Sequence, residues 1–334
     1  MVRIEIVFSR GDDMGGVQRF SIMLGEQLEK RGYDVVLVFG GIENKIATVT
    51  NLKCIFLRDL SRYSFLGFHK YLNKKDPNCV RILGSTAVGL GGVLSSRNSI
   101  FVFHGLASNY SNSYRKLLLR IVEKIIAFSY RNRVFLKYSD CEQLGFRDSN
   151  VIPNYVDSEK FVPSFDRDVD ALVVSRHSQQ KMIKKMIDFC VGEKFERVII
   201  LGDGPDFQEN VAYAEERILG ASTKFTFIKY DARPERYFSR AKYYVHFAVS
   251  EGMPLAVLEA MASGCIVVLN RFQGAEELIR HSHTGYIVDS VSSTSLPAYD
   301  QDVGSRAREV VIESYSVDAF ADAYENLISR MIAH

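Results

Sequence analysis

The chain has 334 residues, of which 47% are hydrophobic and 25% charged, and its formal net charge is +2. This balance is typical of a soluble, core-forming protein and excludes a largely disordered or collagen-like chain. Because domains usually have roughly 100–200 residues, the length predicts two of them. The five cysteines are scattered without CxxC spacing, which argues against structural zinc and disulfides and favours a reducing cytoplasm.

The near-zero total charge hides an asymmetry between the two halves of the chain. Residues 1–153 carry 22 Lys and Arg against 13 Asp and Glu, whereas residues 154–334 carry 20 against 27. Within residues 62–137 the numbers are 13 and 2. Such a block favours an anionic partner: a membrane surface, a nucleic acid or a phosphorylated ligand. Since the chain has no known nucleic-acid-binding motif, nucleic acid is the weakest of the three.

The first half of the chain alternates predicted strands and helices. A β-branched and aromatic run predicts a strand over residues 3–8, and apolar spacing predicts a helix over 17–30 that Gly32 ends. A second strand over residues 33–39 completes a βαβ unit, which implies a parallel sheet. Further strands are predicted at 79–83, 99–103, 133–136 and 150–152, and helices at 65–75, 87–95 and 113–130.

The helix predicted over residues 113–130 is both amphipathic and basic. Its cations stand beside a series of Leu and Ile residues. This combination favours peripheral attachment of the protein to an anionic membrane surface. The alternative is that the apolar face packs into the domain and the cations are merely solvated.

A polar segment without periodicity, residues 154–170, predicts the linker between two domains. Beyond it the alternation resumes, with strands predicted at 171–175, 197–201, 224–228, 243–247, 266–269 and 286–288, and helices at 255–262 and 275–280. We therefore expect two doubly wound α/β domains facing a cleft, residues 1–153 and 171–315. Residues 316–334 are expected to form a final helix that packs back on the first domain.

The most informative stretch covers residues 250–268. It predicts a loop carrying Glu251, then Pro254 at the first position of a helix that contains Glu259. A helix N-terminus offers unpaired N–H groups and a partial positive charge, which suit a phosphate. Two carboxylates there would repel a phosphate unless they bind something else, such as sugar hydroxyls. The residues alone are explained equally well by a helix cap with two surface glutamates.

This stretch resembles the E-x7-E signature of retaining, nucleotide-sugar-dependent glycosyltransferases of the GT-B fold, of the family 4 type. Seven residues separate Glu251 from Glu259, and the flanking EGMP and LEAMASG are also similar to that family. The resemblance continues in residues 15–16, 24–35, 151–157, 201–205, 284–289 and 315–320, although Tyr155 stands where Gly is usual. It covers essentially the whole chain and implies two Rossmann-like domains, with the donor bound by the C-terminal one.

The resemblance implies roles for particular residues. Arg176 and Lys181, which follow the strand at 171–175, would hold the donor diphosphate and stabilise the departing charge. Without the resemblance, Arg176 and Lys181 would be interpreted as two exposed cations. Lys184 is an alternative to Lys181 as the lysine that holds the diphosphate. Glu251 would orient the sugar through its hydroxyls and Glu259 would bind the ribose.

Further candidates follow other predicted strands. Amides near Leu255 would contact the diphosphate, and Tyr230 marks the loop expected near the base. His104 resembles a histidine that family members place beside the donor sugar, and its alternative role is a structural hydrogen bond. Of the other histidines, His177 is a weaker candidate and His246 is expected in the core.

Two pairs of glycines would let backbone approach the donor closely. Gly15 and Gly16 follow the first strand, and Gly202 and Gly204 follow the strand at 197–201. Ordinary tight turns would explain all four equally well.

The sequence thus favours a retaining glycosyltransferase that moves a sugar from a nucleotide-diphosphate donor to a hydroxyl of a saccharide or lipid-linked acceptor. The resemblance implies a UDP-linked sugar, because UDP-sugars are the usual donors of that family. Cell-surface polysaccharide or glycolipid synthesis would use such an activity. The resemblance implies a front-face mechanism, in which the leaving phosphate helps deprotonate the acceptor. It also implies no metal or other cofactor. The alternatives are a non-catalytic nucleotide-sugar-binding partner of another transferase and a GT-B-fold sugar-nucleotide epimerase.

Overall fold

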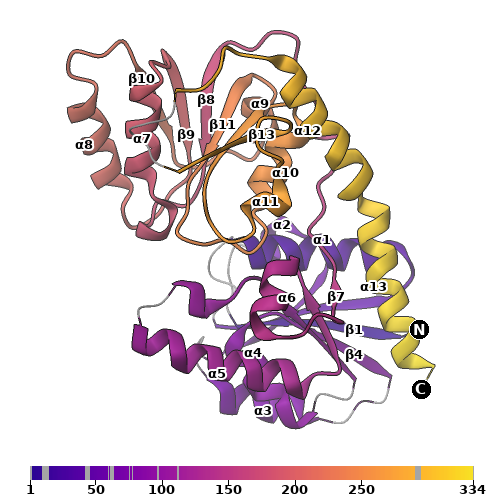
Figure 1. The fold of residues 1–334 in the computed structure, drawn as a ribbon. Coiled ribbons are helices and arrows are strands. Elements are labelled where there is room, and N and C mark those ends of the chain that lie inside the picture. Colours follow the sequence, from indigo (N-terminus) through magenta and orange to yellow (C-terminus); the bar gives the residue numbers. More distant parts are fainter. Residues whose placement is uncertain are drawn as a thin grey trace. The chain divides into compact units, whose positions relative to one another are not determined.

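The computed structural model describes residues 2–9, 15–41, 46–58, 60, 64–74, 76, 78–95, 98–110, 113–289 and 295–333, without the side chains of residues 47, 48 and 113. The chain divides into two compact units (Figure 1). Unit 1 comprises Met1–Asn154 with Val317–His334, and unit 2 comprises Tyr155–Ser316. Among the described residues, no helix combines the length and the apolar character needed to cross a membrane.

Unit 1 is built on a seven-stranded sheet in the order β3-β2-β1-β4-β5-β6-β7, with every neighbouring pair parallel. The strands are β1 (Arg3–Phe8), β2 (Asp34–Gly40), β3 (Lys53–Leu57), β4 (Cys79–Leu83), β5 (Ser99–Phe103), β6 (Asn132–Phe135) and β7 (Asn150–Val151). Strands β2 and β5 are nearly continuous apolar runs, as expected where helices cover both faces of a sheet. The neighbouring strands β1 and β4 each carry a charged residue inside the run, and these two residues, Glu5 and Arg81, form an ion pair at 3.1 Å. The sequence prediction missed β3.

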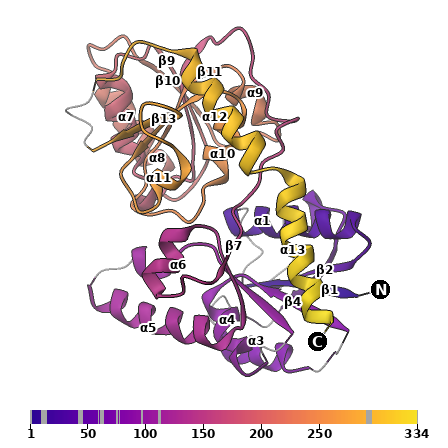
Figure 2. The same cartoon turned by 45° about the vertical axis from the view of Figure 1, so that its right-hand side comes forward.

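The helices of unit 1 are α1 (Gly16–Lys30), α2 (Ile46–Val49), α3 (Phe65–Leu72), α4 (Thr86–Gly92), α5 (Ser113–Ser129), α6 (Tyr138–Leu144) and α13 (Val317–Ile332), with 3-10 turns η1 (Val93–Ser95) and η2 (Ala107–Tyr110). The C-terminal helix α13 packs on α1 (Figure 2). Arg31 Nη1 donates to both Asp322 and Glu325 at 2.6 Å. The Phe20 ring packs edge-on against Phe320, with centroids 5.8 Å apart. The last segment of the chain is therefore part of unit 1.

Unit 2 contains a six-stranded parallel sheet in the order β10-β9-β8-β11-β12-β13. The strands are β8 (Val169–Val174), β9 (Arg197–Leu201), β10 (Lys224–Ile228), β11 (Ala241–His246), β12 (Ile266–Asn270) and β13 (Gly285–Val288). The helices are α7 (Ile183–Gly192), α8 (Phe207–Arg217), α9 (Glu235–Phe238), α10 (Leu255–Ala262), α11 (Ala275–Leu278) and α12 (Gln301–Ser314), with the 3-10 turn η3 (Gln179–Lys181).

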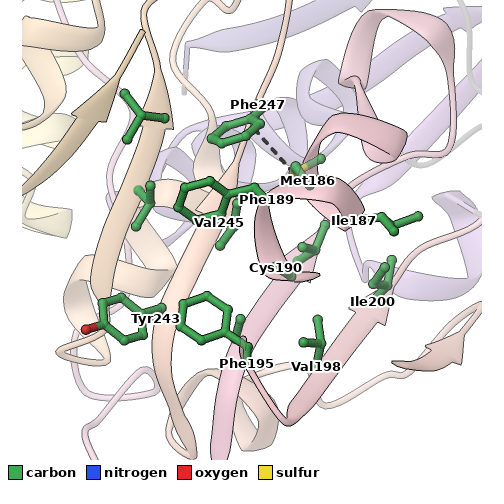
Figure 3. Close-up of a cluster of buried hydrophobic side chains, with 14 of the residues drawn as sticks. Met186, Ile187, Phe189, Cys190, Phe195, Val198, Ile200, Tyr243, Val245 and Phe247 are labelled. Atoms are coloured by element: carbon green, nitrogen blue, oxygen red, sulfur yellow. Dashed lines mark hydrogen bonds between the residues drawn. The ribbon is translucent and has the colours of Figure 1, made fainter. Parts of the chain in front are cut away.

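The core of unit 2 joins α7 to the middle of its sheet (Figure 3). Phe189 packs edge-on against Phe247, with ring centroids 5.4 Å apart, and the Phe247 amide donates to Met186 Sδ at 3.3 Å. Burying each such side chain contributes roughly 1.5–3 kcal/mol. This packing fixes the start of α7 relative to the end of β11, which are the two places where candidate site residues lie.

Residues 155–170, expected as a linker, instead pack on unit 2. Phe161 is buried and its ring lies 5.6 Å from that of Phe238. The guanidinium of Arg167 donates to the carbonyl of Ser263 at 2.6 Å, and the Ser164 amide donates to that of Ser239. The structural boundary therefore falls between Asn154 and Tyr155.

Both sheets reverse their strand order beside the first strand. The reversal lies between β1 and β4 in unit 1 and between β8 and β11 in unit 2. Open parallel sheets bind ligands at the carboxyl ends of the two strands that flank such a point. In unit 2 those ends lead into the segments with Lys181 and Glu251.

Candidate active site

Glu251 and Lys181 meet at the reversal point of the second sheet. Glu251 follows β11 and is only 8% exposed. Its Oε1 accepts hydrogen bonds from Lys181 Nζ and from His246 Nε2, the latter at 2.9 Å. The loops are also joined by their backbones, since the Val249 amide donates to the Gln180 carbonyl at 3.0 Å. The structure thus brings together two residues that the sequence assigned to one site.

The Glu251 carboxylate is held in its ionised form. Burial by itself would raise its pKa, but the hydrogen bond from His246 and the charge of Lys181 outweigh burial and lower the pKa to about 2. An ionised carboxylate accepts hydrogen bonds and donates none. The residue is therefore suited to orienting a ligand's hydroxyl groups.

His246, which the sequence placed in the core, is buried but belongs to this cluster. Besides bonding to Glu251, its ring reaches Tyr244, with Nδ1 3.4 Å from Oη. The Tyr244 hydroxyl donates to the carbonyl of Val174 at 3.1 Å. Strand alternation puts His246 on one face of β11 but cannot show that the following loop returns to it. Sequence reasoning therefore missed the residue.

Glu259 lies close to the same cluster. It is a buried residue of α10, which begins at Leu255 after Pro254. Burial, followed by the charges of Glu259 and Glu251, raises the pKa of Tyr244 well above its usual value. Both glutamates of the E-x7-E spacing therefore act on one tyrosine. The first amides of α10 add the backbone donors of a helix start.

Arg176 lies in the loop after β8 and is exposed. This loop pairs with the one after β9, because the Ser175 amide donates to the Leu201 carbonyl and the His177 amide to the Asp203 carbonyl, both at 3.0 Å. The pairing requires glycine at two positions, since a Cβ at Gly202 would lie 1.9 Å from the Ser175 carbonyl oxygen.

At Gly204 the corresponding Cβ would lie 2.2 Å from the His177 carbonyl oxygen. These glycines therefore hold the Arg176 loop in place, whatever their contact with a donor. His177 itself is buried, with Nδ1 3.1 Å from Asn210 Nδ2 and its ring 4.9 Å from that of Phe207. It packs as a structural residue, and burial lowers its pKa.

Two other candidates lie apart from the cluster. Lys184 bonds to Glu209 on the exposed side of α7, so the structure joins Lys181 and not Lys184 to Glu251. Tyr230 follows β10 and is 77% exposed. Its ring is accessible for stacking, and its contact with a base stays a prediction.

Unit 1 has a pocket of about 270 Å³ at the carboxyl ends of β4 and β5. His104, Ser85 and Glu123 contribute polar atoms to it. Among the described residues, His104 Nε2, Ser85 Oγ and Glu123 Oε2 are buried and have no hydrogen-bond partner. Burial lowers the pKa of His104 to about 4, so its imidazole is neutral at pH 7. The sequence pointed to His104 but not to Ser85 or Glu123.

Gly15 and Gly16 lie where α1 begins. The Gly15 amide donates to Gln18 Oε1 at 3.1 Å, and a Cβ on Gly16 would meet no atom within 4 Å. The next residue, Val17, lines the pocket that contains His104. A role of the two glycines in donor binding stays a prediction.

No group of three or more His, Cys, Asp or Glu side chains that could hold a metal ion occurs in the part of the chain that the structure describes. The acidic pair Asp12 and Asp13 lies outside the described residues. Asp168 and Asp170 instead form ion pairs with basic side chains of unit 2, Arg240 and Lys242. Metal independence stays a prediction.

Comparison with known proteins finds a family similarity in the second half of the chain. Residues 157–303 match the family described as Glycosyl transferases group 1. This range includes Arg176, Lys181, Glu251 and Glu259. The matched range lies within unit 2, the unit that contains the Glu251 cluster.

Two curated proteins are similar to the chain. It is 20% identical to UDP-Gal:alpha-D-GlcNAc-diphosphoundecaprenol alpha-1,3-galactosyltransferase of Escherichia coli, over 96% of this chain and 95% of that protein. It is 22% identical to N-acetyl-alpha-D-glucosaminyl L-malate synthase of Bacillus anthracis, over 54% of this chain and 53% of that protein.

Solved structures show the same fold. Sucrose-phosphate synthase from Thermosynechococcus elongatus superposes with a TM-score of 0.83 at 17% identity, over 100% of both chains. HepE of Anabaena, in complex with UDP and glucose, gives 0.82 at 16% identity, over 99% of this chain and 100% of that one. The prediction of a GT-B fold with two Rossmann-like domains is confirmed.

Proposed function

We propose that the protein is a retaining glycosyltransferase that uses a UDP-linked sugar as donor and a hydroxyl of a saccharide or lipid-linked molecule as acceptor. Synthesis of cell-surface polysaccharide or glycolipid would use this activity. The observation that carries the proposal is the cluster of Lys181, Glu251 and His246 at the reversal point of a group 1 domain. A relative named for a UDP-Gal donor and a structural neighbour in complex with UDP and glucose support it.

The donor diphosphate would bind between Arg176, Lys181 and the first amides of α10. Lys181 bonds to Glu251 in this structure, and a diphosphate would compete for the ammonium group. Glu251 keeps its hydrogen bond from His246 in that event. It can then accept hydrogen bonds from the hydroxyls of the sugar, while Glu259 binds the ribose.

Transfer breaks the bond between the anomeric carbon and the phosphate oxygen and forms a bond from that carbon to the acceptor oxygen. The acceptor proton passes to the leaving phosphate on the same face of the sugar, which gives retention. Arg176 and Lys181 stabilise the charge that develops on the diphosphate. In this proposal those two cations neutralise the diphosphate without a metal ion.

Donor binding tests the assignment of Lys181. The thermal unfolding of the protein would be followed with a panel of UDP- and GDP-linked sugars, for the wild type and for Lys181→Met. One UDP-sugar should raise Tm, and Lys181→Met should weaken its binding about tenfold or more, because charge-assisted hydrogen bonds contribute roughly 1.5–3 kcal/mol.

Lys184→Met is the matched control, since Lys184 is a neighbouring cation that bonds to Glu209. It should bind the donor as the wild type does. Failure of every nucleotide sugar to raise Tm would contradict the proposal. Loss of binding in Lys184→Met alone would move the diphosphate site to that residue.

A further inference from the structure

Helix α5 of unit 1 has two apolar faces. Its inner face carries Ile126 and Ala127, which are buried in the core of the unit. Its outer face carries six large apolar side chains that are between 48% and 83% exposed. We call them the α5 stripe: Tyr114, Leu117, Leu118, Ile121, Ile125 and Phe128.

The α5 stripe follows the helical repeat. Its members recur at spacings of three or four residues, apart from the adjacent pair Leu117 and Leu118, so they form one band on a helix of 3.6 residues per turn. Glu123 and Ile126, which point to the opposite side, are buried. The helix does pack one apolar face inward, as the alternative expected, but a second apolar face remains outside.

The neighbouring surface extends the stripe. The turn η1 contacts α5, and its Leu94 is 81% exposed. Figure 1 shows α5 beside α3 and α4 on one side of unit 1, and the rotated view in Figure 2 agrees. An exposed apolar band of this extent on a monomer indicates a binding surface.

The charge around the stripe has one sign. Arg115, Lys116, Lys124 and Arg131 are exposed on α5 or just after it. The only acidic residue in 113–131 is Glu123, which is buried and accepts a hydrogen bond from the Ser108 amide at 3.1 Å. The outer face therefore combines apolar side chains and cations without an exposed carboxylate.

We propose that the α5 stripe docks onto a lipid bilayer that contains anionic lipids. Its aliphatic and aromatic side chains enter the boundary between headgroups and acyl chains, and the flanking cations bind lipid phosphates. A second copy of this chain is a poorer occupant, because a two-fold contact would set the same cations against each other. If the acceptor is lipid-linked, this surface would also bring the enzyme to its acceptor. That last step rests on the proposed function.

Vesicle co-sedimentation tests this assignment without any nucleotide sugar. The protein would be mixed with vesicles of phosphatidylcholine alone or with about one third phosphatidylglycerol. We expect at least tenfold stronger binding to the anionic vesicles, weakened by salt. The double variant Leu117→Gln/Ile121→Gln and the single variant Lys124→Glu should each reduce this binding about tenfold.

Matched controls come from unit 2, where Leu219 is 82% exposed and Lys224 is also exposed. Leu219→Gln and Lys224→Glu should bind vesicles as the wild type does. All variants should keep the wild-type circular dichroism and Tm, because the altered side chains are exposed. The stripe variant should also release nucleoside diphosphate from a soluble donor at the wild-type rate.

Equal binding to both kinds of vesicle, or to neither, would overturn the proposal. So would a stripe variant that binds like the wild type. A dimer seen by light scattering without lipid, and lost in the stripe variant, would assign the stripe to a second copy instead. Because the assay needs no donor, its failure is distinct from a failure of the proposed reaction.

Discussion

At the scale of single residues, Glu251 depends on donors from two elements. Lys181 reaches it from the loop after β8, and His246 from the last position of β11. His246 is only 2% exposed and donates to Glu251 Oε1, so it can set the direction of the carboxylate without touching a ligand. We regard it as a positioning residue.

Replacing His246 tests this role. His246→Ala should lower kcat for nucleoside diphosphate release about tenfold with little change in KM, because the carboxylate loses the donor that it keeps when the diphosphate binds Lys181. His246→Gln, which keeps an N–H donor, should recover part of the rate. His283→Ala is the control, since His283 is exposed and is not a member of the Glu251 cluster. A rise in KM alone would contradict a positioning role.

The lowered pKa of Glu251 makes a prediction about acid stability. A carboxyl group whose folded pKa is about 2, against 4.5 for the free group, stabilises the fold fully above pH 4.5. This stabilisation is lost as the pH falls from 4.5 towards 2. Urea unfolding should show a loss on the order of 2 kcal/mol between pH 7 and pH 3 from this residue.

Glu251→Gln removes that contribution, so its unfolding free energy should depend less steeply on pH over the same range. Glu209→Gln, at an exposed carboxylate, should keep the wild-type slope. Equal slopes for Glu251→Gln and the wild type would show that the carboxylate is not stabilised by its two donors.

At the scale of elements, α10 owes its position to a close crossing with α12. A Cβ at Gly304 would lie 2.2 Å from the carbonyl oxygen of Gly264. Arg308 of α12 adds hydrogen bonds to the carbonyls of Phe161 and Ala262. Since α10 carries Glu259, this crossing supports the site.

Gly304→Ala should therefore destabilise the protein by about 1–3 kcal/mol, the usual range for an added methyl group in a tightly packed place. Ser305→Ala, at the exposed neighbour, should change the unfolding free energy by less than about 0.5 kcal/mol. Denaturant unfolding of both variants measures the difference. A Gly304→Ala variant as stable as the wild type would mean that α10 and α12 can separate at little cost.

Strands and helices whose apolar residues follow one clear repeat were predictable from the sequence. Elements whose apolar residues serve two surfaces were not. All six strands of unit 2 were expected, and most of them are the short apolar runs of strands covered on both faces. Strand β3 (Lys53–Leu57) was missed, because it is a run of only five residues between two turn-like segments of the sequence. For α5, the period predicts a helix but cannot say which of two apolar faces is inside.

The site was predictable only in part, for a similar reason. Spacing and resemblance pointed to Glu251, Glu259 and Lys181, since these residues lie in loops or helix starts after strands. His246 was not predicted as a site residue, because its partner Glu251 lies in the loop that follows β11 and turns back towards it. A sequence pattern does not contain that contact. The segment 155–170 has no periodicity, so its packing on unit 2 through Arg167 was equally hidden.

At the scale of the whole molecule, charge and chemistry are divided between the two units. The basic block and the α5 stripe belong to unit 1, whereas the Glu251 cluster belongs to unit 2. Each unit can therefore be altered separately. A variant of the α5 stripe that no longer binds lipid should still release nucleoside diphosphate from the donor, and a Glu251 variant should still bind lipid.

The most direct test of the account is the release of nucleoside diphosphate from the UDP-sugar that stabilises the protein. The wild type should release it slowly, and Glu251→Gln should be at least about a hundredfold slower, as for loss of one preorganised group at a reacting centre. Glu209→Gln should match the wild type. Donor binding without release, or equal rates for Glu251→Gln and the wild type, would contradict the account and favour a non-catalytic binding protein.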